Sequence, residues 1–553
     1  MARDYTWLCR GRMARPAVCR HRASRHNAAL TIFRRKGSPV SQSLIEALQN
    51  PALYPHPVAG FEVIETHISW VLLTGDYAYK LKKPVDFGFL DFSSREAREH
   101  FCHEELRLNQ RSARDLYLEV LPVTGSPEAP QLGGDGPVVD HLLKMRQFPQ
   151  SGLLSNVLAR GELTPAHIDT LAQRIAELHA QAARVPAGHA LGSAEAVMAP
   201  VRQNFEQIRP LLGEEAADLA QLQHLEAWAE DTFARLAPLL EQRKADGFIR
   251  ECHGDIHLAN VTLIDGEVVL FDCIEFNEPF RLIDVISDAA FLAMDLEDRG
   301  LKALSRRFIN AYLELSGDYA GLALLPFYKA YRAMVRAKIS LFRLGQEQDP
   351  VERAMILRQY RNYAALAESY SAIPSRFLAI THGVSAVGKS HVALRLVEAF
   401  GAVRLRSDVE RKRLFPAAGE AELYGAEASQ QTYAQLHRLA AGILRAGFPV
   451  VLDATYLKHA QRLAAQAVAE DSGVPFLILD CQAPQTVIAA WLAERQAEGR
   501  DPSDATLAVI QAQEAGREPL RDEELPHSGR IDTHDAASLN GLVERIRQQL
   551  PEL

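Results

Sequence analysis

The sequence lacks the features that define several classes of protein. Its 553 residues contain no apolar run of the ~18–20 residues that a membrane-spanning helix needs. The six cysteines are scattered, without C-x-x-C spacing or disulfide density, which fits a reducing compartment. The net charge of −9 argues against nucleic acid as a general partner. We therefore expect a cytoplasmic protein without a membrane anchor, with about two to four domains for this length.

Residues 1–40 differ in composition from the rest of the chain. The first 36 residues hold nine arginines and Lys36 against one acidic residue, Asp4. They have no apolar core, which argues against a secretory signal, and the composition fits a transit peptide, a nucleic-acid arm or an extension from an upstream start codon. We expect residues 1–40 to be a disordered, Arg-rich leader.

The clearest chemical signal is a glycine-rich run, Gly383-Val384-Ser385-Ala386-Val387-Gly388-Lys389-Ser390. It fits the P-loop pattern G-x-x-x-x-G-K-[ST] at every required position, with a strand-like stretch before it and a helix-like stretch after it. The backbone N–H groups of such a loop bind phosphate oxygens. Lys389 is expected to reach the β- and γ-phosphates, and the Ser390 hydroxyl to hold Mg²⁺. The run predicts binding of a nucleoside triphosphate such as ATP.

A second stretch with the chemistry of phosphoryl transfer lies upstream. The run His253-Gly254-Asp255-Ile256-His257-Leu258-Ala259-Asn260 has the H-x-D-x-x-x-x-N spacing of a kinase catalytic loop. Two apolar strands then flank Asp265-Gly266, a strong two-residue hairpin signal. Counting outward from that turn places Asn260 and Asp272 at the same end of the hairpin. We expect Asp255 to orient or deprotonate an acceptor hydroxyl, and Asn260 and Asp272 to hold Mg²⁺.

The residues around this loop resemble the aminoglycoside phosphotransferase branch of the protein-kinase-like fold. The resemblance rests on the HGD-x-H-x-x-N run, on Leu270-Phe271-Asp272 and on Ala78-Tyr79-Lys80, whose Ala and Lys share one strand face. It implies that Lys80 contacts the α- and β-phosphates and that Glu104, on the following helix, is its partner. A glycine-rich G-x-G-x-x-G loop is missing, as is usual in that branch.

The distal part of the chain resembles small P-loop kinases of the type that includes polynucleotide kinase, gluconate kinase and zeta-toxin-like proteins. The resemblance rests on the P-loop, on Asp408 at the end of the second strand of this part, and on Asp453 at the end of the third. It implies that Asp408 acts on the acceptor hydroxyl and that Asp453 holds the metal. Arg495 and Arg500 are the candidate lid arginines that stabilise charge on the transferred phosphoryl group.

The pattern of elements predicts two domains behind the leader. Residues 41–370 are expected to form an α+β, protein-kinase-like fold of the aminoglycoside phosphotransferase type. Residues 371–553 alternate strand candidates with helices, which predicts an α/β P-loop kinase fold with a parallel sheet. The strands of this second domain are expected at 377–381, 403–406, 449–452 and 476–479, with a weaker one near Ile531.

These features favour an ATP- and Mg²⁺-dependent phosphotransferase with two nucleotide sites, acting on the hydroxyl groups of a small molecule. One alternative is a nucleotide-gated regulator in which one kinase domain is degenerate, since the first domain has the weaker phosphate-binding motifs. Another is a kinase of polynucleotide 5′-hydroxyl ends. The sequence does not identify the acceptor, because acceptor pockets are built from loops that converge in three dimensions.

Overall fold

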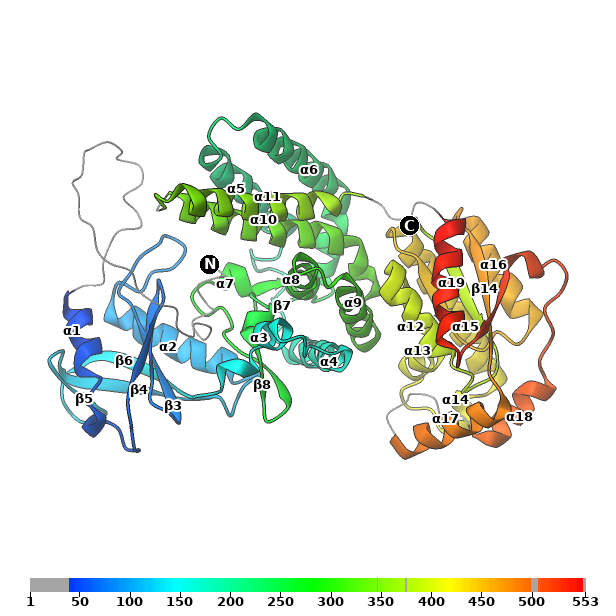
Figure 1. The fold of residues 1–553 in the computed structure, drawn as a ribbon, viewed down its shortest axis with the longest axis horizontal. Helices are drawn as coiled ribbons and strands as arrows, with labels where there is room; N and C mark the ends of the chain where they lie inside the picture. The colour runs from blue at the N-terminus through cyan, green and yellow to red at the C-terminus, as the bar shows by residue number, and fades with distance from the viewer. Residues whose placement is uncertain (1–38, 346, 373–374, 499–505, 551–553) are drawn as a thin grey trace. The chain divides into compact units, whose positions relative to one another are not determined.

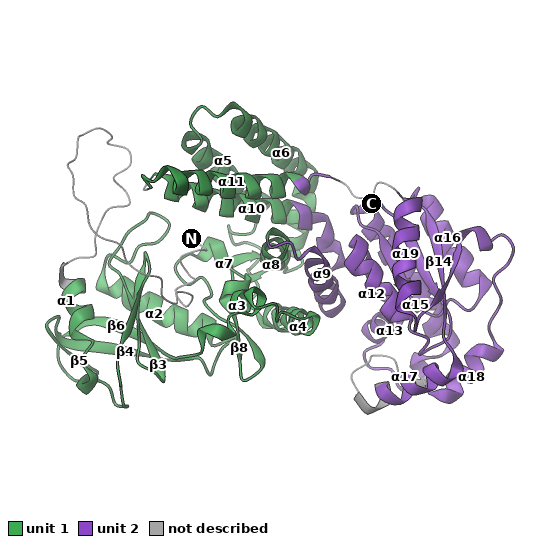
Figure 2. Cartoon of the chain, viewed as in Figure 1, with its two compact units in different colours: residues 1–298, 327–368 green, residues 299–326, 369–553 purple. Residues whose placement is uncertain are grey.

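The computed structural model describes residues 39–345, 347–372, 375–498 and 506–550. Nearly all of the expected leader, and Pro374 near the expected boundary between the two domains, lie outside the described residues. The chain divides into two compact units, which Figure 2 distinguishes by colour. Unit 1 comprises residues 1–298 and 327–368, and unit 2 comprises residues 299–326 and 369–553. Among the described residues, no helix combines the length and apolarity needed to cross a bilayer.

Unit 1 begins with a six-stranded antiparallel sheet in the order β1-β2-β3-β6-β4-β5. The strands are β1 (Glu62–Glu65), β2 (Ser69–Leu73), β3 (Tyr77–Lys82), β4 (Tyr117–Ser126), β5 (Ala129–Leu132) and β6 (Val138–Arg146). In β4, Pro122 and Gly125 interrupt the alternating pattern that marks a strand in the sequence.

Both faces of this sheet are buried, which explains why β2 carries no polar face. Val71 and Leu73 pack into one apolar cluster, and Trp70 and Leu72 pack into another on the opposite face. Helix α1 (Pro39–Ala47) contributes to the second cluster, and helix α2 (Arg95–Asn109) packs along β4 and β6. Figure 1 shows α2 running beside the strands. The sheet thus holds the side chains of β3 at fixed positions.

The rest of unit 1 is mainly helical. The helices are α3 (Leu154–Ala159), α4 (Pro165–Gln181), α5 (Ala194–Ile208), α6 (Ala216–Ala245), α7 (Glu278–Arg281), α8 (Val285–Asp298), α10 (Leu325–Leu344) and α11 (Pro350–Ser369). A short pair of strands, β7 (Ile249–Glu251) and β10 (Leu282–Asp284), brackets the hairpin β8 (Val261–Ile264) and β9 (Glu267–Leu270). Helix α8 is buried along twelve consecutive residues, 285–296, so it is the central helix of this part.

Unit 2 contains a five-stranded parallel sheet in the order β12-β13-β11-β14-β15. The strands are β11 (Leu378–His382), β12 (Val403–Arg406), β13 (Val450–Asp453), β14 (Phe476–Gln482) and β15 (Ser528–Asp532), as the sequence predicted. The helices between and after them are α12 (Lys389–Phe400), α13 (Ser407–Leu414), α14 (Glu420–Leu423), α15 (Ala426–Arg445), α16 (His459–Asp471), α17 (Gln485–Glu498), α18 (Leu507–Ala515) and α19 (Ala536–Gln549). Parallel strands place their carboxyl ends at one edge of the sheet, where ligands bind in open α/β sheets.

Unit 2 also includes a segment that the expected domain division places in the first domain. Helix α9 (Lys302–Ser316) packs against α12 and the edge strand β12, and the short helix η6 (Tyr319–Leu324) packs against α15. Figure 2 shows α9 in the colour of unit 2. Asn310 Oδ1 accepts a hydrogen bond from the backbone N–H of Arg404 on the edge strand β12, at 2.8 Å. The Arg306 guanidinium donates to the Glu398 and Ala399 carbonyls at the end of α12. The segment therefore caps an exposed strand edge and a helix C-terminus.

We expect Glu314→Gln, on α9, to destabilise the P-loop unit. Glu314 accepts hydrogen bonds from Arg404 Nε and Nη2 at 2.7 and 3.0 Å, and Arg404 Nη1 donates to the Ser390 carbonyl at the start of α12. Loss of the paired charge from this poorly exposed site should cost about 2–3 kcal/mol of the free energy of unfolding. Denaturant unfolding of the full chain measures it, with the exposed Lys302→Gln on the same helix as control. Equal stability of the two variants would contradict the assignment of α9 to unit 2.

Candidate functional site

Two carboxylates of α8 fix the backbone of the catalytic-loop candidate of unit 1. The Asp288 carboxylate accepts hydrogen bonds from the backbone N–H groups of His253 and Gly254, both at 2.9 Å, and the Asp295 carboxylate accepts one from Leu258 N–H at 3.0 Å. Gly254 has a φ of +89°, and an added Cβ would lie 2.7 Å from the Phe280 carbonyl oxygen. Glycine is thus required here by both conformation and space.

His253 braces the loop and leaves the catalytic role to Asp255. Its Nε2 lies 2.9 Å from the carbonyl oxygen of Phe271, which ties the loop to the far end of the hairpin. Burial alone would lower the pKa of His253, but nearby Cys273, Asp288 and Asp255 raise it to about 9. Nδ1 of the same ring accepts a hydrogen bond from the backbone N–H of Asp255 at 3.3 Å, so both ring nitrogens are used in bracing the loop.

Asn260 and Asp272 meet at one end of the hairpin, as counting from the turn predicted. The register pairs Ile264 with Glu267 and Val261 with Leu270, and the Phe271 N–H then bonds to the Asn260 carbonyl at 3.1 Å. Asp272 adopts a φ of +64°, so the strand bends at this residue. Asn260 Oδ1 and Asp272 Oδ2 are both buried and have no hydrogen-bond partner among the described residues.

Two orphaned buried oxygens on one amide and one carboxylate fit a divalent cation with oxygen ligands, such as Mg²⁺. Buried polar atoms normally have partners, so unsatisfied ones mark a site that a ligand completes. Burial raises the pKa of Asp272, while Lys80, at 3.2 Å, opposes that rise. A bound cation would favour the ionised carboxylate further.

Lys80 lies at the centre of a buried cluster of charged side chains. Its Nζ donates to Glu105 Oε1 at 2.7 Å and to Asp272 Oδ1 at 3.2 Å. Burial alone would lower the pKa of Lys80, but the Asp272 and Glu105 carboxylates raise it well above its usual value. Lys82, two residues along the same face of β3, donates to the other oxygen of Glu105 at 2.6 Å and to Glu275. Both lysines are therefore charged and held in place.

The expected partner of Lys80 was wrong by one residue. Glu105 is fully buried and contacts both lysines, whereas Glu104 pairs with Arg107 on the outer side of α2, at 2.9 Å. A signal was available in the sequence: Cys102, Glu105 and Leu108 follow one another at a spacing of three, which places Glu105 on the buried face of the helix. Glu104 is one residue, or about 100°, around the helix from that face.

We expect Glu105→Gln to lower the stability of the protein far more than Glu104→Gln. Burial alone would raise the pKa of Glu105, but Lys80 and Lys82 hold it at about 2. Removing this charge leaves two buried ammonium groups short of a partner, which should cost about 3–5 kcal/mol. The more accessible Glu104 should contribute less than about 1 kcal/mol. Equilibrium unfolding of both variants measures the difference, and equal losses would show that Glu105 is not the buried partner.

Asp255 lies at the mouth of this site and is suited to orient a hydroxyl. Its Oδ2 is 3.4 Å from His257 Nε2 and 3.3 Å from Asn260 Nδ2. Burial alone would raise the pKa of Asp255, but His257, Arg336 and His253 hold it well below its usual range. An ionised carboxylate accepts a hydrogen bond from a hydroxyl, yet one with so low a pKa is a weak base. Of the two expected roles, orientation therefore fits better than prior deprotonation.

In unit 2 the P-loop joins β11 to α12, as predicted. Gly383 has a φ of +143° and Gly388 a φ of +86°, and added Cβ atoms would lie 2.8 Å from the Cys481 carbonyl oxygen and 2.9 Å from the Thr533 side chain, respectively. Close packing of the loop against β14 and the segment after β15 thus requires glycine. Lys389 is buried, and its Nζ donates to the Val384 carbonyl at 2.6 Å.

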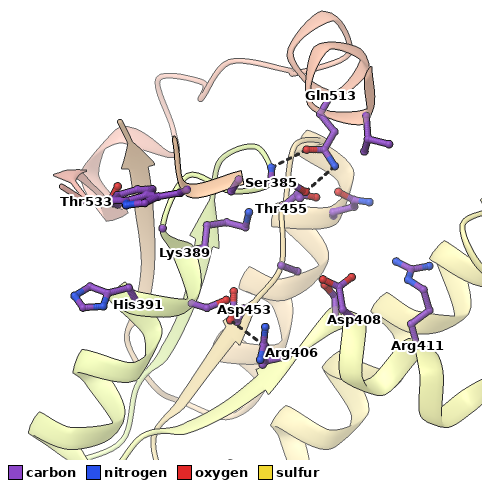
Figure 3. A pocket seen from close by; sticks show the side chains of 18 of the residues that line it. Ser385, Lys389, His391, Arg406, Asp408, Arg411, Asp453, Thr455, Gln513 and Thr533 are labelled. Carbon is purple, nitrogen blue, oxygen red and sulfur yellow. Dashed lines mark hydrogen bonds and ion pairs between the residues drawn. The ribbon is translucent and has the colours of Figure 1, made fainter. Parts of the chain in front are cut away.

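The P-loop opens onto a cavity of about 1160 Å³ at the carboxyl ends of the strands. Lys389, Ser390, Asp408 and Asp453 all line it, so the structure brings the predicted residues together. Figure 3 shows the Asp453 carboxylate near Lys389 and Arg406, whose Nε lies 3.8 Å from Asp453 Oδ2. That same oxygen is buried without a hydrogen-bond partner among the described residues, which fits a metal ligand.

Asp408 has the electrostatic environment of a general base. Burial first, and the Asp453 carboxylate second, raise the pKa of Asp408 above its usual value. A carboxylate with a raised pKa accepts a proton more readily, which suits removal of a hydroxyl proton.

Of the expected lid arginines, Arg500 and the side chain of Arg495 lie outside the described residues. The structure instead brings to the cavity residues that the sequence gave no reason to single out, among them Arg406, Arg411 and Gln513. Gln513, on α18, accepts a hydrogen bond from the backbone N–H of Ser385 at 2.7 Å and donates to its hydroxyl. The carboxamide oxygen of Gln513 therefore occupies the position at the Ser385 N–H where a phosphate oxygen is expected to bind.

The class of each unit is established by comparison with known families. Residues 138–325 match the phosphotransferase enzyme family, and residues 378–520 match the AAA domain family. The chain thus has a domain of the phosphotransferase enzyme family followed by a P-loop domain of the AAA type. It is 31% identical over 476 residues to uncharacterized proteins of Mycobacterium tuberculosis and Mycobacterium bovis, covering 83% of this chain and 92% of theirs. The chain belongs to the same family as these mycobacterial proteins.

Two solved structures illustrate the similarity of parts of the chain to known folds. A choline/ethanolamine kinase family protein from Mesorhizobium loti is 15% identical and covers 60% of this chain and 97% of its own, with a TM-score of 0.37. A putative kinase from Chloroflexus aurantiacus is 20% identical and covers 32% of this chain and 99% of its own, with a TM-score of 0.28.

Proposed function

We propose that the protein is an ATP- and Mg²⁺-dependent phosphotransferase with two nucleotide sites, one in each unit, that transfers the γ-phosphoryl group to hydroxyl groups of small molecules. The observation that carries the proposal is the repeated combination of a buried lysine with carboxylates that have an unsatisfied buried oxygen. It occurs at Lys80 with Asp272 and at Lys389 with Asp453.

In unit 1, Lys80 would bind phosphate oxygens while Glu105 keeps its ammonium group at the edge of β3. Asn260 and Asp272 would hold Mg²⁺, which with ATP supplies the transferable phosphoryl group and neutralises its charge. Asp255 orients the acceptor hydroxyl by accepting its hydrogen bond. The Asp288 carboxylate helps to position Asp255 by fixing the backbone of the two residues before it.

In unit 2, the backbone N–H groups of residues 385–390 and the Lys389 ammonium would bind the phosphates. Ser390 and Asp453 would hold the cation. Asp408, with its raised pKa, accepts the proton of the acceptor hydroxyl. For Ser385 N–H to reach a phosphate, Gln513 has to give up its hydrogen bond.

Titration with a non-hydrolysable ATP analogue and Mg²⁺ tests the proposal. We expect about two equivalents of nucleotide per chain, with one lost in Lys389→Ala and the other weakened by at least ~10-fold in Asp272→Asn, because each change removes a charged contact of ~1.5–3 kcal/mol. Asn tolerates the left-handed conformation of Asp272, so the backbone is preserved. Asp265→Asn, in the exposed turn of the same hairpin with a φ of +53°, is the matched control.

A single equivalent that is insensitive to Asp272→Asn would overturn the two-site proposal. Two equivalents without transfer of labelled phosphate to any hydroxyl compound would instead favour a nucleotide-gated regulator.

A further inference from the structure

Arg411, on α13, lines the P-loop cavity with a guanidinium group that is incompletely satisfied. Its side chain is 6% exposed. Nη1 donates to the Leu423 carbonyl at 3.1 Å and to Ser429 Oγ at 3.2 Å, and the group lies over the ring of Tyr424. Nε is buried and has no hydrogen-bond partner among the described residues. The edge of the guanidinium formed by Nε and Nη2 is therefore unused within the part of the chain that the structure describes.

Arg411 also forms no ion pair among the described residues, unlike its neighbour Arg413, although the Asp408 carboxylate is close enough to be affected by its charge. Arg413, two residues along the same helix and less buried, forms an ion pair with Glu410. No carboxylate of the described residues forms an ion pair with Arg411. Burying a guanidinium without an anion is costly, and such groups are normally paired or bind a charged ligand. The site is complete when an anion occupies the cavity beside Arg411.

The position of Arg411 separates this anion from the phosphates of the nucleotide. Asp408 and Arg411 are three residues apart on α13, so their side chains share one face of the helix. Figure 3 shows Asp408 between Lys389 and Arg411 in that view. An anion at Arg411 would therefore lie next to Asp408 on this face of α13, where the rest of an acceptor molecule belongs.

We propose that the acceptor phosphorylated by unit 2 is a small hydroxylated oxyanion, a carboxylate or a phosphate monoester, whose anionic group binds Arg411 while its hydroxyl lies at Asp408. The inference rests on the proposed function of this unit and names its class of substrate. Two oxygens of a carboxylate or phosphate match the planar edge of a guanidinium. The acceptor oxygen bonds to the γ-phosphorus of ATP as the bond from that phosphorus to the β–γ bridging oxygen breaks. ADP leaves, and the hydroxyl proton passes to Asp408.

The test uses the full chain with Asp255→Asn, which silences unit 1, and γ-labelled ATP. A soluble metabolite extract is divided by anion exchange into a retained, anionic fraction and an unretained fraction. We expect label to pass to hydroxyl compounds of the anionic fraction alone. Arg411→Gln should lower that transfer by about 100-fold, the effect of losing one charge-assisted contact of ~3 kcal/mol. Lys412→Gln, which removes an exposed charge from the same helix, should leave it unchanged. Nucleotide binding should be equal in all three proteins.

Each other outcome decides against the inference. Transfer to the unretained fraction, or equal transfer by Arg411→Gln and Lys412→Gln, would overturn it while leaving phosphotransfer intact. No transfer to either fraction would overturn the proposed function of unit 2 and the inference together.

If Arg411→Gln does not fold, the test uses Arg411→Lys, which keeps the charge but loses the planar guanidinium, and its transfer should still fall by at least ~10-fold. Treating the anionic fraction with a phosphatase that is then removed distinguishes the sources: the acceptor survives if it is a carboxylate and disappears if it is a phosphate monoester.

Discussion

Lys389→Ala is expected to abolish phosphoryl transfer by unit 2, lowering its kcat/KM by about 10³-fold or more. The Lys389 ammonium is buried at the mouth of the P-loop, and its known contact is the Val384 carbonyl of its own loop. Loss of one preorganised cationic donor at a developing phosphoryl charge accounts for a change of this size.

The measurement uses Asp255→Asn as the background so that unit 1 does not contribute transfer. Lys412→Ala, an exposed lysine of the same unit, is the control for loss of a positive charge. Lys389→Arg tests the geometry, since a guanidinium keeps the charge but does not fit the space of an ammonium group. Full transfer in Lys389→Ala would mean that the P-loop does not hold the reacting nucleotide, and the assignment of unit 2 as a phosphotransferase would fail.

Local patterns predicted those parts of both sites that are built within one short segment. The P-loop between β11 and α12 and the meeting of Asn260 with Asp272 follow from motif spacing and hairpin register, which depend on neighbours in the sequence. Glu105 was missed because the family pattern allows either of two adjacent acids, and the buried face of α2 had to decide between them. The family resemblance predicted a glutamate partner for Lys80 but did not decide between Glu104 and Glu105.

Other features depended on contacts between distant segments, and no local pattern encodes these. Gln513 reaches the P-loop across 128 residues of sequence. Helix α9 has the spacing of any amphipathic helix, which shows that one face is buried but not against which sheet. It packs on β12 of unit 2, although the match to the phosphotransferase enzyme family, residues 138–325, includes it. The same limit explains why Arg411 could not be singled out: its unpaired charge is a property of its surroundings and not of its position in a motif.

Asp255→Asn is expected to lower the kcat of unit 1 by about 10²–10⁴-fold while leaving the KM for ATP unchanged. The carboxylate lies beside His257 and Asn260, and its strongly lowered pKa keeps it ionised to accept the acceptor hydroxyl. Asparagine keeps the size of the side chain and an oxygen that can accept from Asn260 Nδ2, so the loop held by Asp288 should persist. What is lost is the negative charge that aligns the hydroxyl as its oxygen attacks. The assay uses Lys389→Ala as its background, so that all transfer comes from unit 1. A fall in nucleotide affinity equal to the fall in kcat would show that Asp255 supports the metal site and does not act on the acceptor.

Because the low pKa predicts an orienting role, the activity of the unaltered unit should also stay level as the pH falls from 7 towards 5, whereas a base with a raised pKa would lose activity in that range.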